Sequence, residues 1–133
     1  MDYPSVSVLT PTYNRINFIE LCILNLKNQT YPLDKLEWFV LDDGKSAYTN
    51  DQLEYIIKSI APIKFKYIYS PIKATIGAKR NKLVKLAAHK ICIMMDDDDI
   101  YQKTYIKKSI DTMINNNKKC VGSNQMIFYF KDK

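Results

Sequence analysis

Short apolar segments alternate with amphipathic segments along the chain. The apolar segments are typical of buried β-strands and span residues 6–9, 36–41, 64–69 and 91–95. Apolar side chains recur at helical spacing within residues 16–29, 53–60, 77–89 and 105–114. Two weaker strand candidates follow, at residues 120–122 and 125–130. This alternation predicts right-handed βαβ crossovers and therefore an α/β fold, with a mostly parallel sheet and helices on both faces.

The composition fits a single domain over residues 1–133, because 47% hydrophobic and 26% charged residues are typical of a globular protein. The N-terminus does not resemble a signal peptide, and no apolar run is long enough to cross a bilayer. Three isolated cysteines among apolar residues favour buried, reduced thiols, and we therefore expect a cytoplasmic protein. The net charge of +6 favours a phosphate-bearing ligand, although the scattered lysines also fit a solvated basic surface.

Polar residues follow each predicted strand. The carboxyl ends of parallel strands lie along one edge of a sheet, and ligands bind in the crevice outside that edge. The residues that follow the four strands are Pro11 to Arg15; Asp42, Asp43 and Gly44; Thr75, Gly77, Lys79, Arg80 and Asn81; and Asp96 to Asp99. We therefore predict that distant parts of the chain meet in one polar binding site, here called the rim.

The run of four aspartates at residues 96–99 needs a physical explanation. Adjacent carboxylates about 4 Å apart repel by roughly 1 kcal/mol in water and by about 4 kcal/mol near a protein surface. A divalent cation would offset this repulsion, and carboxylate oxygens suit Mg²⁺ or Mn²⁺. Asp96 and Asp98 would point the same way if the alternation of the strand continued through them. The alternative is an exposed acidic turn, or a helix start that Asp99 caps.

Three other rim residues each have two interpretations. Arg80 could contact a phosphate, or the segment around it could simply begin a helix with its lysines in solvent. Tyr13 could stack on a nucleobase or be an ordinary surface aromatic. Asp43 could accept hydrogen bonds from a base or from ribose hydroxyls, or belong to a plain turn.

The rim segments carry a resemblance to a known family. In chain order they are VSVLTPTYNR, LEWFVLDDG, IGAKRN and ICIMMDDDDI. Each is weak alone, but together, in this order and with these flanking strands, they resemble the family-2 glycosyltransferases. The resemblance extends over nearly the entire chain. It implies a Rossmann-like GT-A fold, which is the fold of nucleotide-diphospho-sugar transferases.

The resemblance also implies roles for individual residues. Asp98 would be the principal metal ligand, with Asp96 as a second candidate, and Arg80 would lie near the diphosphate or base. Asp96 or Asp97 would contact ribose, sugar or a metal-bound water. Pro11, Tyr13 and Asp43 would surround the base. The full set expected to bind the nucleotide-sugar is Pro11, Tyr13, Arg15, Asp43, Arg80, Asp96 and Asp97.

The implied activity is a Mn²⁺- or Mg²⁺-dependent, inverting transfer from a nucleotide-diphosphate sugar, with a UDP-sugar favoured, to an acceptor hydroxyl. In the family the catalytic base lies well beyond the aspartate triplet. We therefore expect it beyond Lys133, together with the acceptor-binding half, and assign no catalytic residue here. The acceptor would be a glycan, a protein or a lipid.

Three other interpretations follow from the sequence. A nucleotide-sugar-binding module without turnover fits the same motifs. Nucleic-acid binding is disfavoured by four aspartates on the binding edge. A nucleotidyltransferase would more typically open with a glycine-rich loop, and the segment from Thr10 to Arg15 contains no glycine. A half-domain could also expose an apolar face and self-associate as a homo-oligomer.

Overall fold

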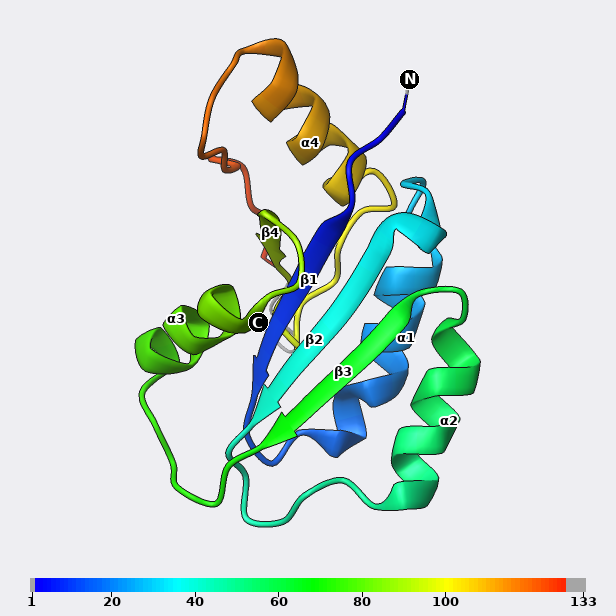
Figure 1. The fold of residues 1–133 in the computed structure, drawn as a ribbon, viewed down its shortest axis with the longest axis vertical. Coiled ribbons are helices and arrows are strands. Elements are labelled where there is room, and N and C mark those ends of the chain that lie inside the picture. The colour runs from blue at the N-terminus through cyan, green and yellow to red at the C-terminus, as the bar shows by residue number, and fades with distance from the viewer. Residues whose placement is uncertain (1, 129–133) are drawn as a thin grey trace.

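Four strands lie side by side and parallel, in the order β3-β2-β1-β4, in a computed structural model that describes residues 2–128 (Figure 1). Their bounds are Val6–Thr12 for β1, Leu36–Asp42 for β2, Lys64–Tyr69 for β3 and Ile91–Met94 for β4. The two central strands pair along their whole length, from Val6 opposite Leu36 to Thr12 opposite Asp42. The predicted parallel sheet is confirmed.

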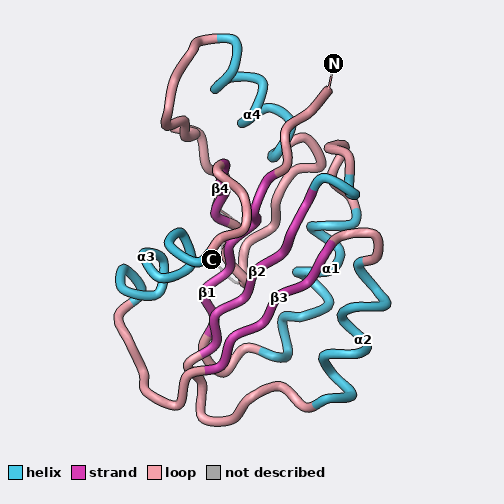
Figure 2. Tube along the Cα trace, viewed as in Figure 1, coloured by secondary structure: helices cyan, strands magenta, loops and turns pink. Residues whose placement is uncertain are grey.

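Helices cover both faces of this sheet, as predicted (Figures 1 and 2). Helices α1 (Ile19–Lys27), α2 (Asn50–Ile60) and α4 (Tyr105–Asn115) share one hydrophobic core. Helix α3 (Ile76–Leu86) packs on the opposite face. Short 3₁₀ turns at Ile16–Phe18 and Leu33–Lys35 precede α1 and β2. In the part of the chain that is described, no helix is long and apolar enough to span a bilayer.

The alternation of side chains along the strands divides the core into two layers. Val8 and Trp38 face the layer beneath α1 and α2, whereas Leu9 and Phe39 face the layer beneath α3. Successive residues of a strand point to opposite faces, so each central strand is buried on both sides. Burial of such a side chain contributes roughly 1.5–3 kcal/mol, and Trp38 is among the largest side chains buried in this way.

Several element boundaries differ from the prediction, among them the end of β1 and the end of α3. Strand β1 continues past Pro11 to Thr12, whereas β4 pairs with it only as far as Leu9. Beyond Leu9 the described part of β1 therefore has a neighbour on one side only, a position where proline is tolerated. Helix α3 ends at Leu86, before His89, because the chain turns there and the His89 N–H donates to Ser7 Oγ at 3.1 Å.

The last part of the chain departs furthest from the prediction. Residues 120–122 and 125–128 are not strands, and residues 129 and 130 of the second candidate lie outside the described residues. Cys22 is buried as expected, but Cys92 is only half-buried and Cys120 is exposed. The apolar spacing within residues 77–89 also predicts Leu86 in the core, but this last residue of α3 is 40% exposed.

Candidate functional site

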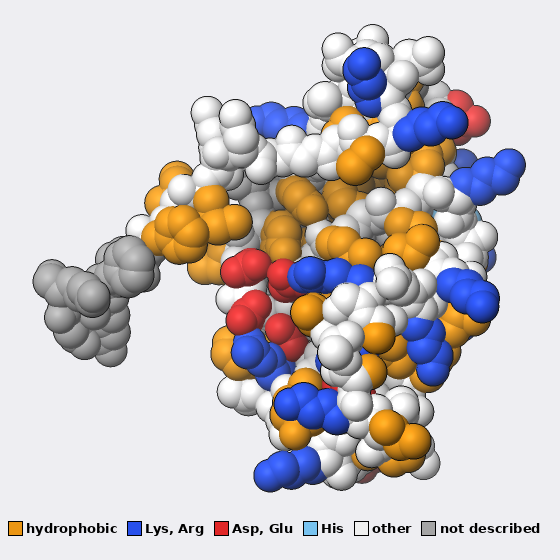
Figure 3. Space-filling view, turned by 90° about the vertical axis from the view of Figure 1, so that its left-hand side faces the viewer, with side chains coloured by type: hydrophobic (Ala, Val, Ile, Leu, Met, Phe, Trp, Pro, Cys, Tyr) orange, Lys and Arg blue, Asp and Glu red, His pale blue; other side chains and the backbone are white. Residues whose placement is uncertain are grey.

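The rim forms where the strands end. The loops after β1 and β2, the start of α3 and the aspartate run after β4 are joined there by hydrogen bonds and ion pairs. Figure 3 shows acidic side chains clustered among lysines and arginines on one side of the molecule, below a hollow lined with hydrophobic side chains. The parallel topology therefore brings together the four segments that the sequence singled out.

Asp42 holds the loops after β1 and β2 in place. Its carboxylate accepts hydrogen bonds from Tyr67 Oη at 2.6 Å and from the Gly44 N–H at 2.8 Å. The Lys45 N–H donates to Asn14 Oδ1 at 2.7 Å, which joins the two loops. A Cβ atom at Gly44 would lie 2.7 Å from Asn14 Oδ1 and 2.8 Å from the Asn14 nitrogen. This close approach requires glycine.

Asp43 is the buried charge of the rim, with its side chain only 2% exposed. Lys79 Nζ lies 2.6 Å from Asp43 Oδ1, and the Ala74 N–H donates to Asp43 Oδ2 at 2.7 Å. Burial raises the pKa of the Asp43 carboxyl, but the hydrogen bonds from Lys79 and Ala74 and the charge of Lys79 outweigh it, and the pKa lies below its ordinary value. Asp43 is therefore ionised at neutral pH.

Lys79, which the sequence places on the rim, is buried and paired with Asp43 rather than exposed to solvent. Its side chain is 6% exposed, and Nζ also donates to the Thr12 carbonyl at 3.0 Å. The spacing contained the signal, because Lys79 lies one helical turn before Leu83, which is fully buried beneath the sheet.

A cavity of about 130 Å³ adjoins this pair. Its walls are formed by the end of β2, the loop after β3 and the first turns of α3, with the lining residues Leu41, Asp43, Ser70, Ile72, Ala74, Ala78, Lys79 and Lys82. Tyr13 lies on the same edge of the sheet, and Lys73 Nζ lies 4.4 Å from the centre of its ring. Four of these residues are apolar, and the cavity holds one carboxylate, that of Asp43, beside two lysines. Apolar walls with one ionised acceptor suit a flat ring that carries an N–H group.

Two arginines pair with the aspartate run, and Arg15 reaches two of its carboxylates, Asp98 and, at 3.7 Å, Asp97. Arg80 lies 3.2 Å from Asp96 Oδ1, and Arg15 lies 2.5 Å from Asp98 Oδ2. Asp97 is 7% exposed and accepts a hydrogen bond from Thr12 Oγ1 at 2.6 Å. Burial is the main cause that raises the pKa of Asp97, and the charge of Asp98 adds to it. Two arginines thus offset the repulsion within the run.

The donor set of the run fits a hard divalent cation only after rearrangement. Strand β4 ends at Met94, so its alternation does not extend to Asp96 and Asp98, and within residues 2–128 no three acidic, histidine or cysteine side chains converge on one point. The carboxylates of Asp96 and Asp98 are 36% and 43% exposed, and the arginines that hold them are about 40% exposed. Carboxylates that are accessible in this way suit Mg²⁺ or Mn²⁺, which take further ligands from substrate phosphates and water.

Arg80 carries an unused donor: its Nε is buried without a hydrogen-bond partner in the described part of the chain. Such a group is rare in native structures unless a bound molecule satisfies it. Because Arg80 also contacts Asp96, this donor lies next to the aspartate run.

Two buried amides support the loop after the run: Asn25 within α1 and Gln29, two residues beyond its end, neither of which was predicted as a site residue. Asn25 donates to the Asp99 carbonyl at 2.8 Å and accepts from the Tyr101 N–H at 3.1 Å. Gln29 donates to the Gln102 carbonyl at 3.0 Å and accepts from the N–H of Ile106 in α4 at 3.1 Å. The available signal was a pair of amides four residues apart on the apolar face of a helix.

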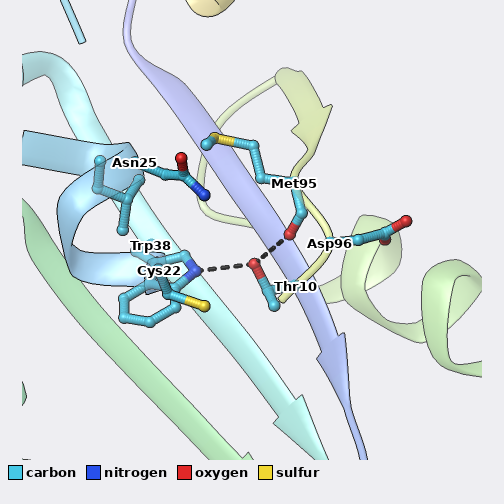
Figure 4. Close-up of a pocket in the computed structure, with 7 residues that line it drawn as sticks. Thr10, Cys22, Asn25, Trp38, Met95 and Asp96 are labelled. Carbon is cyan, nitrogen blue, oxygen red and sulfur yellow. Dashed lines mark hydrogen bonds between the residues drawn. The ribbon is translucent and has the colours of Figure 1, made fainter. Parts of the chain in front are cut away.

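Figure 4 shows how the start of the run is fixed. Thr10 Oγ1 accepts from Trp38 Nε1 at 2.8 Å and donates to the Met95 carbonyl at 2.6 Å, beside a cavity of about 10 Å³. The Asp96 side chain points away from these residues, and its N–H donates to Tyr101 Oη at 2.7 Å. Asp99 does not cap α4, which begins after Thr104.

Known proteins share this sequence pattern and this fold. The sequence profile of glycosyl transferase family 2 matches residues 7–132. EpsH of Bacillus subtilis (strain 168), classed as a glycosyltransferase, is 30% identical over 112 residues, which cover 84% of this chain and 31% of EpsH.

Two solved structures share the fold. S. aureus TarS 1-349 in complex with UDP superposes with a TM-score of 0.70 at 24% identity, over 85% of this chain and 33% of the other. The mannosyltransferase PcManGT from Pyrobaculum calidifontis, in complex with GDP-Man and Mn²⁺, has a TM-score of 0.64 at 24% identity, over 86% of this chain and 32% of the other. These likenesses confirm the GT-A architecture. The chain spans less than half the length of the curated relatives that it matches. Because the family profile matches residues 7–132, the chain belongs to glycosyl transferase family 2.

Proposed function

We propose that residues 1–133 form one donor-binding domain that holds a nucleotide-diphosphate sugar for metal-dependent, inverting transfer to an acceptor hydroxyl. The observation that carries the proposal is the rim, where a buried, ionised Asp43 adjoins a cavity and two arginines adjoin the aspartate run. UDP is the favoured nucleotide, because TarS of this fold was solved with UDP. The GDP-Man complex of PcManGT makes GDP the second candidate.

In this proposal the base lies in the cavity beside Asp43, with Pro11 and Tyr13 at its edge. The Asp43 carboxylate accepts an N–H of the base, and its ionised form offers both oxygens as acceptors. Asp97 accepts from a ribose hydroxyl. Arg80 Nε, which lacks a partner in the described structure, donates to the diphosphate.

Asp98 and Asp96 would hold Mn²⁺ or Mg²⁺ together with the diphosphate. When bound, such an ion would supply positive charge against the charge that develops on the leaving group. To free these carboxylates, Arg15 and Arg80 would move from Asp98 and Asp96 to the phosphate oxygens, a short movement for partly exposed side chains. Charge balance at the rim is thereby kept, since the arginines exchange one set of oxyanions for another.

No residue described here is proposed as the catalytic base. A base must lie within hydrogen-bond reach of the acceptor hydroxyl, and we propose that it belongs to the portion of the relatives that this chain does not span. The alternative, a binding module without turnover, is favoured by that same partial coverage. An assay for sugar transfer or donor hydrolysis distinguishes the two, because only the enzyme releases UDP.

Calorimetry with UDP, GDP and dTDP, with and without Mn²⁺, tests the donor site. We expect UDP binding that depends on Mn²⁺ and is lost in Asp98→Ala. Asp34→Ala is the matched control, because Asp34 is an exposed aspartate that precedes β2, at the opposite end of the sheet. If the folded chain bound none of these nucleotides with Mn²⁺ present, the donor-site proposal would be wrong.

A further inference from the structure

We propose that Lys79 is a positioning residue for the nucleobase, because it fixes the Asp43 carboxylate that receives the N–H of the base. This inference rests on the proposed function and adds a residue to it. The ligand class is a base whose ring edge carries an N–H, such as uracil, thymine or guanine.

The burial of Lys79 needs an explanation. Lysine is almost never fully buried unless it is paired, and here both members of the pair are shielded from water. A buried ion pair contributes little net stability, because the loss of hydration offsets the attraction. An apolar residue would serve as well for packing between Leu83 and the sheet, and the charge points instead to a role at the cavity that both residues line.

The contacts of the pair define that role. Asp43 Oδ1 accepts from Lys79 at 2.6 Å and Oδ2 accepts from the Ala74 N–H at 2.7 Å, so the carboxylate is held from both sides. Each carboxylate oxygen can accept a second hydrogen bond. Lys79 is itself fixed by the Thr12 carbonyl at 3.0 Å, which ties the arrangement to the end of β1.

The test compares Lys79→Met with Lys85→Met, an exposed lysine of the same helix. Calorimetry in Mn²⁺ uses UDP and ribose 5-diphosphate, which has the same ribose and diphosphate but no base. Loss of a charge-assisted contact predicts roughly tenfold weaker UDP binding by Lys79→Met, with ribose 5-diphosphate changed by less than about twofold. Lys85→Met should match the unsubstituted chain with both ligands.

A double-mutant cycle with Asp43→Asn separates positioning from an independent effect. If Lys79 acts through Asp43, then Lys79→Met costs little further UDP affinity once Asp43→Asn is present. Fully additive losses would overturn the positioning role, and so would equal losses for UDP and ribose 5-diphosphate.

Lys79→Met leaves a buried carboxylate without its counter-charge, so folding is checked by thermal melting. Lys79→Gln keeps an N–H donor without the charge and serves if Lys79→Met does not fold; we expect a several-fold loss of UDP affinity. A folded variant of either kind that binds UDP as the unsubstituted chain does would overturn the inference alone. A folded, unsubstituted chain that binds no UDP would overturn both this inference and the proposed function.

Discussion

At the scale of single residues, Gly44 and Gly77 are predicted to respond in opposite directions to alanine. A Cβ atom at Gly44 would meet the backbone nitrogen and side chain of Asn14, whereas at Gly77 no atom lies within 4 Å. We expect Gly44→Ala to lower the free energy of unfolding by about 1–3 kcal/mol through overpacking. Gly77→Ala, in the exposed first turn of α3, should raise it by up to about 1 kcal/mol. Urea unfolding measures both, and equal effects would contradict the close approach at Gly44.

Neighbouring residues of the same type can have different partners. Asp42 and Asp43 are adjacent, yet Asp42 accepts from the Gly44 N–H and from Tyr67 of β3, whereas Asp43 faces the cavity. The sequence predicted Asp43 and Lys79 on the same rim but not their pairing, because a lysine is normally expected in solvent. Only its position one turn before the buried Leu83 indicated otherwise.

At the scale of elements, α1 is predicted to control the aspartate run through Asn25. Asn25→Ala would leave the Asp99 carbonyl and the Tyr101 N–H without their partner. We expect a loss of about 1–3 kcal/mol in stability and weaker Mn²⁺-dependent UDP binding, because the loop that carries the carboxylates would loosen. Asn28→Ala, at an exposed position at the end of the same helix, should change neither. Unchanged UDP affinity in folded Asn25→Ala would show that α1 does not hold the run.

Element order was predictable, and element ends were less so. Helix α2 begins at Asn50, three residues before the predicted start, because Thr49 and Gln52 form a reciprocal capping box. This T-x-x-Q pattern is visible in the sequence but lies outside the apolar spacing that was used. The end of α3 could not be predicted in this way, because the Ser7 hydroxyl that receives the His89 N–H comes from a distant strand.

At the scale of the whole molecule, the rim was predictable because parallel strands place all their carboxyl ends at one edge. Its internal contacts were not, since they depend on which side chains meet across that edge. The four aspartates suggested a metal site by their mutual repulsion, yet the structure relieves that repulsion with Arg15 and Arg80. The positions of the aspartate side chains, from which a cation would be bound, therefore depend on their attraction to arginines of other rim segments as well as on repulsion within the run.

The loss of folding stability at acid pH offers a test of this charge balance. The folded-state pKa of Asp43 is lowered, so its contribution to stability is present above the unfolded pKa of about 3.9 and is lost as pH falls through the lower folded value. Asp97 and Asp99 have raised pKa values in the folded state, chiefly through burial. Their ionisation therefore lowers the stability of the fold as pH rises from the unfolded pKa through the higher folded values.

Comparison between variants therefore isolates Asp43. We expect urea unfolding between pH 5 and pH 2.5 to show a shallower acid loss in the double variant Asp43→Asn with Lys79→Met, which removes both charges of the pair. Asp34→Asn, an exposed control, should parallel the unsubstituted chain. If stability fell equally with pH in all three proteins, Asp43 would not have a lowered pKa in the folded state.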